Sequence, residues 1–170
     1  MTIHLVSGDI THIKADAIVN AANSSLLGGS GVDGAIHKAA GKQLLAECRN
    51  LNGCRPGEAK VTKGYNLYAG FVIHTVGPVW NGGGKAEAEI LKNCYLNSLK
   101  SVTQKGLKSV AFPCISTGRY RFPIDMAAEI AVSTVREYSQ SDLNIEEIYF
   151  VCYDKENYNE YAKILKLAQL

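Results

Sequence analysis

Short, almost wholly apolar segments recur along this chain, and stretches with helical periodicity separate them. Several of these segments are too uniformly apolar for a half-exposed position, which predicts buried strands of a sheet. The predicted strands are Ile3–Val6, Ala17–Val19, Lys60–Thr62, Phe71–Val76, Val110–Phe112 and Ile148–Val151. Apolar and small side chains three or four residues apart predict helices over residues 91–102, 126–138 and 158–168. Strands that alternate with helices predict an α/β fold in layers.

We expect residues 1–170 to form one domain, because a chain of this length buries a sufficient core and contains no repeat, low-complexity tract or linker. Its composition, 46% hydrophobic and 20% charged, is typical of a soluble globular protein. No apolar run approaches the length of a membrane span, and residues 1–4 lead into the first predicted strand rather than into a signal peptide. We therefore expect a cytoplasmic protein without a membrane partner.

The formal net charge of +2 is too small to predict a general nucleic-acid surface, and the lysines and arginines are scattered. We expect a monomer with no specific nucleic-acid partner. The five cysteines form no CxxC pair and no zinc-like spacing with histidine. Their odd number argues against a closed disulfide framework, so we interpret them as reduced structural thiols. The residues present call for no metal and no cofactor.

A glycine-rich segment follows the second predicted strand and runs into a predicted helix. It carries two carboxamides, Asn20 and Asn23, then the cluster Gly28–Gly34, with Asp33 where the helix is expected to begin. Glycines let backbone N–H groups approach an anion closely, and a helix start adds unpaired donors and the positive end of its dipole. The segment is therefore typical of a phosphate cradle. Asp33 would repel bound phosphates, so we expect it to have a function of its own.

Gly29–Gly34 also matches the GxGxxG pattern of dinucleotide-binding folds, but its context differs. In that motif the strand turns directly into the helix, and an acidic residue ends the next strand about 20 residues later. Here residues 21–28 separate Asn20 from Gly29, and no strand ends in Asp or Glu near position 54. The GxxxxGK[ST] motif of nucleoside triphosphatases is absent. The sequence thus favours neither a nicotinamide enzyme nor a nucleoside triphosphatase.

A second loop, Pro113–Pro123, follows the fifth predicted strand and precedes a predicted helix. The small residues Ser116, Thr117 and Gly118 allow their backbone N–H groups to form an anion nest. Taken alone, the segment is equally typical of a plain turn between a strand and a helix. Together with the first glycine-rich loop, it suggests two walls around one diphosphate, with Tyr120 over a sugar.

Other polar segments also follow predicted strands. Asp9 follows the first strand, Gly77-Pro78 the fourth and Tyr153-Asp154 the last. In open α/β sheets, ligands bind outside the carboxyl ends of the strands, where loops turn into helices. We therefore expect five loops to converge on one cleft.

Six motifs of the chain, taken together and in order, resemble a macrodomain. They are Gly8–Thr11, Asn20–Asn23, Gly28–His37, Gly57–Ala59, His74–Pro78 and Pro113–Pro123. The resemblance covers nearly the whole chain and is closer to the MacroD-type branch, whose members hydrolyse esters of ADP-ribose. It implies a three-layer α/β/α sandwich, with a mixed central sheet of about six strands flanked by helices.

The resemblance also relates residues to parts of ADP-ribose. It implies that Asp9 accepts a hydrogen bond from the adenine amino group, that the backbone of Ile10 reads the ring, and that Tyr153 stacks on it. Asn23 is implied to bond the distal ribose, with Asp33 beside the scissile ester. The backbone N–H groups of two loops are implied to hold the diphosphate: Gly31 and Val32 in the first, and Ser116, Thr117, Gly118, Arg119 and Tyr120 in the second. Asn20 completes the implied ligand-binding set.

The implied function is hydrolysis of acyl-ester-linked ADP-ribose: deacetylation of O-acetyl-ADP-ribose, removal of mono-ADP-ribose from Glu or Asp side chains of proteins, or both. Asn23 and Asp33 are the predicted catalytic pair, because ester hydrolysis needs a placed water and a stabilised oxyanion. Either Asp33 or a substrate phosphate would take the proton of this water. Two alternatives use the same pocket: a reader that binds ADP-ribose without cleaving it, and a phosphatase of ADP-ribose 1″-phosphate.

The chain departs from the family pattern at three positions. Ser30 replaces a glycine, Arg119 a small aliphatic residue, and Arg121 a frequent glycine. Because a residue other than glycine is strained at positive φ, Ser30 puts the usual backbone path of the first loop in question. The two arginines could either close over the diphosphate or point into solvent, and we expect them to point into solvent.

Three further residues receive structural interpretations. His37 lies four residues after Asp33, on the same face of the predicted helix, and we expect it to be buried against the sheet. His74 lies inside an apolar strand and is expected to be a core histidine with satisfied hydrogen bonds. Cys114 has no histidine near it in the sequence to activate it, so we do not expect it to be a nucleophile.

Overall fold

The computed structural model describes residues 1–170, and its centre is a six-stranded sheet. The strands are β1 (Thr2–Ser7), β2 (Ala17–Ala21), β3 (Ala59–Lys63), β4 (Phe71–Thr75), β5 (Ser109–Phe112) and β6 (Glu147–Cys152). They lie in the order β1-β6-β5-β2-β4-β3. Every neighbouring pair is parallel except β3 and β4, which are antiparallel. The six predicted strands and the mixed sheet are thus confirmed.

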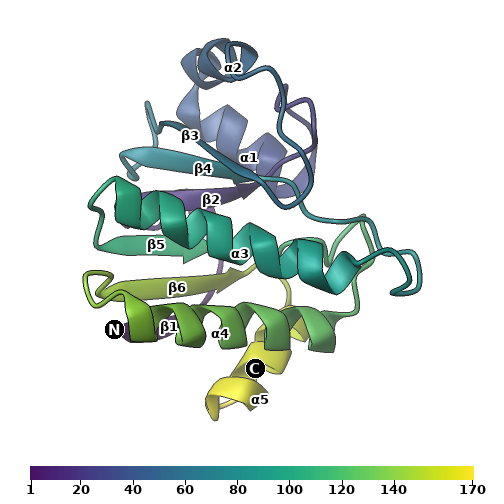
Figure 1. Ribbon diagram of the computed structural model, residues 1–170. Helices are drawn as coiled ribbons and strands as arrows, with labels where there is room; N and C mark the ends of the chain where they lie inside the picture. The colour runs from purple at the N-terminus through teal and green to yellow at the C-terminus, as the bar shows by residue number, and fades with distance from the viewer.

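Five α-helices and one short 3-10 helix cover the sheet. They are η1 (Ile10–His12), α1 (Gly31–Ala40), α2 (Lys42–Arg49), α3 (Glu87–Gln104), α4 (Ile124–Ser141) and α5 (Lys155–Leu165). Helices α3 and α4 run side by side across one face, and α1 and α2 belong to the other (Figure 1). Each face has its own apolar core, which confirms the three-layer prediction. None of the helices has both the length and the apolar character needed to cross a membrane.

Side-chain alternation along the strands decides which face each polar group joins. In β2, Val19 packs in the core beneath α3 and α4, whereas Ile18 packs in the core beneath α1 and α2. Asn20, two residues after Ile18, therefore points to the α1 face. His74 of β4 is likewise two residues after Val72 of that core, and the strand register pairs it with Asn20. Two buried polar side chains thus meet under α1.

The helices differ from the sequence prediction in two places. Helix α2 was not predicted; it follows α1 after a single residue, Gly41, whose φ of 88° breaks the helical path. Helix α5 ends at Leu165, so the predicted stretch to residue 168 extends beyond it. Lys166 follows in the left-handed conformation and closes the last turn.

The parallel strands determine where the loops emerge. Strands β1, β6, β5, β2 and β4 are parallel neighbours, so their carboxyl ends lie at one edge of the sheet. The loops after these strands carry Asp9, Tyr153, Pro113–Pro123, Ala22–Ser30 and Gly77–Ala86, respectively. The five loops expected to converge are therefore at the same edge.

Candidate functional site

The first loop holds Asn23 in place with its own backbone. Asn23 Nδ2 donates to the carbonyl of Gly28 over 2.8 Å, and Ser25 Oγ donates to Asn23 Oδ1 over 2.6 Å. These bonds tie the carboxamide across the loop. An amide nitrogen carries two hydrogens, so one N–H of Asn23 remains for a ligand.

Gly29 lies between the two predicted catalytic side chains. A Cβ atom at this position would lie 2.9 Å from Asp33 Oδ2 and 3.3 Å from Asn23 Nδ2. The carboxylate and the amide therefore face the same point of the loop. Glycine is needed here because any side chain would displace one of these two groups.

Ser30 does not strain the loop. Its φ is −106°, and the left-handed conformations fall instead on Gly28 and Gly31, with φ of 93° and 60°. The backbone path that Ser30 put in question is therefore available to this sequence. Ser30 precedes the first turn of α1 without a side-chain capping bond, so the helix start keeps its N–H groups free.

Asp33 is buried in the first turn of α1, and only 5% of it is exposed. Its Oδ1 accepts a hydrogen bond from Asn20 Nδ2 over 2.7 Å, and His37 Nε2 lies 3.4 Å from the same oxygen. Its Oδ2 is buried and has no partner within the chain. Because a buried carboxylate oxygen without a hydrogen bond is costly, this atom is the part of the site that calls for a ligand or a water.

Two runs of unpaired backbone N–H groups lie in the loops that follow β2 and β5. The N–H groups of Gly28, Gly29 and Ser30 donate no hydrogen bond within the chain, and those of Gly31 and Val32 follow in the first turn of α1, where no helical carbonyl is within reach. Consecutive free donors of this kind form an anion site.

The second run lies in the loop between β5 and α4. No backbone N–H group from Ser116 to Tyr120 donates a hydrogen bond within the chain. The loop is closed below them, since Phe122 N donates to Ser116 O over 2.9 Å. Ser116 has a φ of 67°, and its Oγ is buried without a partner. Since β2 and β5 are neighbours, the two runs leave the sheet side by side.

The segment between β4 and α3 supports the second run, and sequence reasoning noted only its first two residues. Gly77 lies against Ser116, because a Cβ atom on Gly77 would come within 2.1 Å of Ser116 Oγ. Trp80 N donates to Tyr120 O over 2.8 Å. Glu87 ties the far end of the segment: its carboxylate accepts hydrogen bonds from the backbone N–H groups of Asn81, Gly83 and Lys85. These hydrogen bonds hold the pKa of Glu87 below its usual value, and the bond from Asn81 has the largest effect.

Arg119 and Arg121 are exposed at the rim of the second loop and form no ion pair. Arg121 adopts a φ of 59°, a conformation that costs roughly 1–2 kcal/mol for a residue with a side chain. A glycine at this position would adopt it without strain.

The predicted adenine contacts lie beside one another, because β1 and β6 are neighbours and Ser7 pairs with Cys152. Asp9 Oδ1 accepts hydrogen bonds from Thr11 N (2.9 Å) and Thr11 Oγ1 (2.7 Å), while Oδ2 accepts none. Partial burial acts to raise the pKa of Asp9, but these bonds outweigh it and the pKa is lowered. Tyr153 is 85% exposed, so its ring is free to contact a ligand.

The structure places the other residues of interest below this edge. Asn20 is fully buried, beneath Asp33 rather than on the open side of the site, and His74 is fully buried next to it.

Cys114 and Cys152 lie with their sulfur atoms 3.4 Å apart, and all five cysteines are free. No three histidine, cysteine, aspartate or glutamate side chains are grouped closely enough to hold a metal ion.

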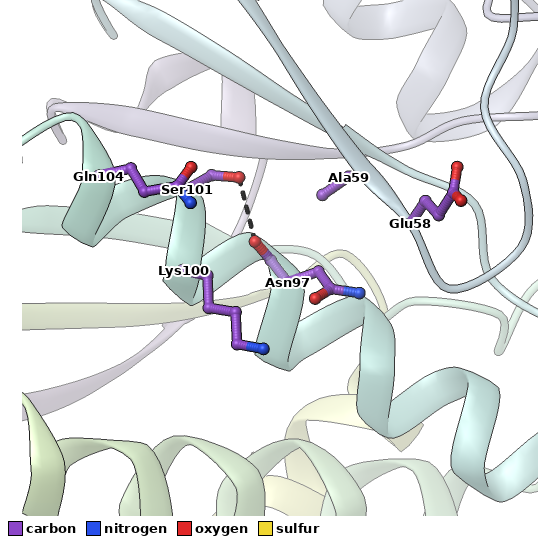
Figure 2. Close-up of a pocket in the computed structure, with 6 residues that line it drawn as sticks. All are labelled: Glu58, Ala59, Asn97, Lys100, Ser101 and Gln104. Carbon is purple, nitrogen blue, oxygen red and sulfur yellow. Dashed lines mark hydrogen bonds between the residues drawn. The ribbon is translucent and has the colours of Figure 1, made fainter.

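A separate hollow of about 290 Å³ lies between edge strand β3 and α3 (Figure 2). It is lined by Glu58, Ala59, Asn97, Lys100, Ser101 and Gln104. The side chains of Lys100 and Glu58 are drawn away from one another, and the hydrogen bond in this view runs from Ser101 Oγ to Asn97 O over 3.0 Å. One apolar residue in the lining is few for a ligand pocket, and none of the predicted site residues is among the six.

Comparison with known proteins gives consistent matches. The family model described as Macro domain matches residues 19–131. A Macro domain-containing protein of Chlorobaculum tepidum is 56% identical over 163 residues, 96% of this chain and 95% of that protein. A protein of Citrobacter rodentium named O-acetyl-ADP-ribose deacetylase is 52% identical over 167 residues, 96% of this chain and 94% of its own length.

Two solved structures agree in fold along nearly the whole chain. The macrodomain of Oceanobacillus iheyensis with ADP has a TM-score of 0.90 at 44% identity, and the match covers 95% of this chain and 88% of the Oceanobacillus iheyensis chain. The Trypanosoma brucei macrodomain in complex with ADP-ribose has a TM-score of 0.92 at 42% identity, and the match covers 96% of this chain and 68% of the Trypanosoma brucei chain. The glycine-rich loop, the strand order and these matches agree, and this chain belongs to the Macro domain family.

Proposed function

We propose that this protein binds ADP-ribose and hydrolyses its acyl esters. The substrates are O-acetyl-ADP-ribose and proteins that carry mono-ADP-ribose on a glutamate or aspartate side chain. Support comes from relatives named O-acetyl-ADP-ribose deacetylase at 52–54% identity and from solved macrodomains with ADP and ADP-ribose.

The ligand would lie along the carboxyl edge of the sheet. Its adenine amino group would donate to the free Oδ2 of Asp9, with the exposed ring of Tyr153 against the base. The two runs of unpaired N–H groups would accept the diphosphate between them. The distal ribose then reaches the point between Asn23 and Asp33.

Hydrolysis needs a water aimed at the ester carbonyl. Asp33 Oδ2, which has no partner in the chain, accepts a hydrogen bond from this water and takes its proton as the water attacks. The free N–H of Asn23 holds the distal ribose, whose oxygen leaves from the tetrahedral intermediate as ADP-ribose. A proton from Asp33 completes the alcohol product.

The observation that carries this proposal is the unpartnered, buried Oδ2 of Asp33 beside an anion site. A buried carboxylate next to phosphates costs Coulomb repulsion and desolvation. A protein that only reads ADP-ribose would gain from losing it. An ester hydrolase uses it.

The test is to incubate the purified protein with O-acetyl-ADP-ribose and, separately, with a carboxylate-linked mono-ADP-ribosylated protein, and to quantify ADP-ribose by chromatography. ADP-ribose should also raise the melting temperature, because a ligand at 100 times its Kd adds about 2.7 kcal/mol to the folded state. AMP should raise it less. Stabilisation without hydrolysis of either ester would identify a reader, and no stabilisation would mean that the pocket is assigned wrongly.

A further inference from the structure

A chain of buried hydrogen bonds runs from Asp33 into the sheet, below the site. It passes through Asn20 on β2, His74 on β4 and Thr62 on β3, three adjacent strands. Asn20 and His74 are fully buried, and Thr62 is 2% exposed. The side chain of Asn20, for which the resemblance implies a ligand contact, is thus fully buried and bonded to Asp33 and His74.

The direction of each bond follows from the chemistry of the partners. A carboxylate only accepts, so the Asn20 atom 2.7 Å from Asp33 Oδ1 is the amide nitrogen. The second hydrogen of this nitrogen points to His74 Nδ1 at 3.1 Å, which must therefore be the unprotonated ring nitrogen. The ring proton lies on Nε2 and is donated to Thr62 Oγ1 over 2.9 Å, and Thr62 donates to the carbonyl of Lys63.

His74 is suited to this fixed role. Burial, with the nearby His37 as a second cause, lowers the pKa of His74 to about 3, so the ring stays neutral near pH 7. A neutral ring with its proton held on Nε2 offers Nδ1 as an acceptor at all times. The amide of Asn20 is thus kept from rotating, and its hydrogen stays aimed at Asp33.

We propose that Asn20 and His74 are positioning residues, which fix Asp33 by Oδ1 so that Oδ2 remains free and aimed at the reacting water. This role rests on the proposed ester hydrolysis and explains why one carboxylate oxygen is anchored while the other has no partner. The required tolerance is narrow, since a misplacement of about 1 Å can cost roughly a hundredfold in rate.

The experiment measures kcat and KM for O-acetyl-ADP-ribose and the Kd for ADP-ribose in four proteins: the wild type, His74→Phe, His74→Gln and Thr62→Val. His74→Phe removes the acceptor and keeps a ring; we expect kcat to fall at least about tenfold with Kd changed less than about twofold. His74→Gln retains an acceptor and a donor and should recover most of kcat. Thr62→Val keeps the shape of Thr62 but removes the acceptor of the His74 proton, so we expect a smaller fall in kcat than in His74→Phe. If His74→Phe does not fold, Thr62→Val tests the positioning role in its place.

A second arm separates positioning from general damage. In an Asp33→Ala background, His74→Phe should lower the remaining turnover no further, because the two residues act through one carboxylate. A wild-type protein that hydrolyses the ester, with kcat undiminished in His74→Phe, would overturn the positioning role alone. Equal losses in kcat and in ADP-ribose affinity would also overturn it, because they indicate a damaged fold. A wild-type protein that hydrolyses no ester overturns the proposed function and, with it, the positioning role.

Discussion

His37 Nε2 lies 3.4 Å from Asp33 Oδ1, one turn further along α1. The two side chains share a helix face, and 14% of the His37 side chain is exposed. The Nε2 atom is buried and makes no hydrogen bond. Asn20 approaches the same oxygen more closely, at 2.7 Å, so Asp33 has one firm anchor and one looser neighbour.

Replacing the looser neighbour should have the smaller effect. We expect His37→Phe to reduce ester turnover less than about tenfold, because the hydrogen bond from Asn20 still holds the carboxylate. The measurement is steady-state ester turnover of His37→Phe, compared with that of His74→Phe under the same conditions. A loss as large as that of Asp33→Ala would instead make His37 part of the proton transfer.

Asp33→Ala should abolish most ester hydrolysis while ADP-ribose still binds. General base catalysis contributes about 10²- to 10⁴-fold, and removal of a negative charge beside the diphosphate relieves repulsion. Turnover and affinity should therefore be measured on the same preparation. Asp125→Ala is the matched control, since it removes an exposed carboxylate from the first turn of α4. Near-normal turnover of Asp33→Ala would exclude the catalytic role.

Gly29→Ala should impair catalysis more than binding. The new methyl group would lie 2.9 Å from Asp33 Oδ2 and 3.3 Å from Asn23 Nδ2, so it must push one of them away. We expect at least about a tenfold fall in kcat, within the hundredfold that a 1 Å misplacement can cost. Gly70→Ala is the control, because its methyl group meets only Asp16 O, at 3.7 Å. If both variants keep full activity, the space at Gly29 is not limiting.

Asp9→Asn should weaken ADP-ribose binding by roughly 1.5–3 kcal/mol, the usual contribution of a hydrogen bond to a charged group. Because the pKa of Asp9 is lowered, the wild-type acceptor stays charged through the acidic range where an ordinary aspartate begins to protonate. Asp142→Asn is a matched control: this aspartate also accepts from a threonine, Thr103, and has a lowered pKa. Titration calorimetry that gives equal affinities for Asp9→Asn and wild type would remove Asp9 from the site.

His74 makes the stability of the fold sensitive to acid. The unfolded chain binds a proton at this residue below its ordinary pKa of 6.5, whereas the folded protein does so only near the lowered pKa of about 3. The free energy of unfolding therefore falls as pH drops below 6.5, by about 2 kcal/mol between pH 7 and pH 5 from this group alone. Denaturant unfolding should show this loss in the wild type and not in His74→Gln, which keeps His37 and the other titratable groups. A difference between the two proteins that stays constant with pH would contradict the lowered pKa.

Much of this architecture could be predicted because it depends on local patterns. Segments such as Ala17–Val19 and Val110–Phe112 are apolar at every position, and only a strand buried on both faces suits them. The conjunction of glycines with Asp33 likewise indicated the loop where a buried carboxylate and free backbone N–H groups lie together. Helix α2 was missed because Gly41 breaks the pattern after α1, although the chain resumes a helix at once.

The remaining features arise from contacts between distant segments. The resemblance implies a ligand contact for Asn20, whereas the alternation along β2 turns this side chain under α1, toward His74, 54 residues away. The support of Ser116 by Gly77 and the capture of three N–H groups by Glu87 have no signal in the sequence, since both depend on how a loop folds back.

The donors that face the proposed diphosphate site belong to the main chain, in the stretches Gly28–Val32 and Ser116–Tyr120. No substitution other than proline deletes a backbone N–H group. An alanine scan of these stretches would therefore leave the donors of the proposed anion site in place, and would respond mainly where a methyl group disturbs the conformation. Side chains in these stretches can therefore vary without removing a donor. The exposed Arg119 and Arg121 fit this picture, because a proposed site built from backbone N–H groups does not depend on the side chains of this loop.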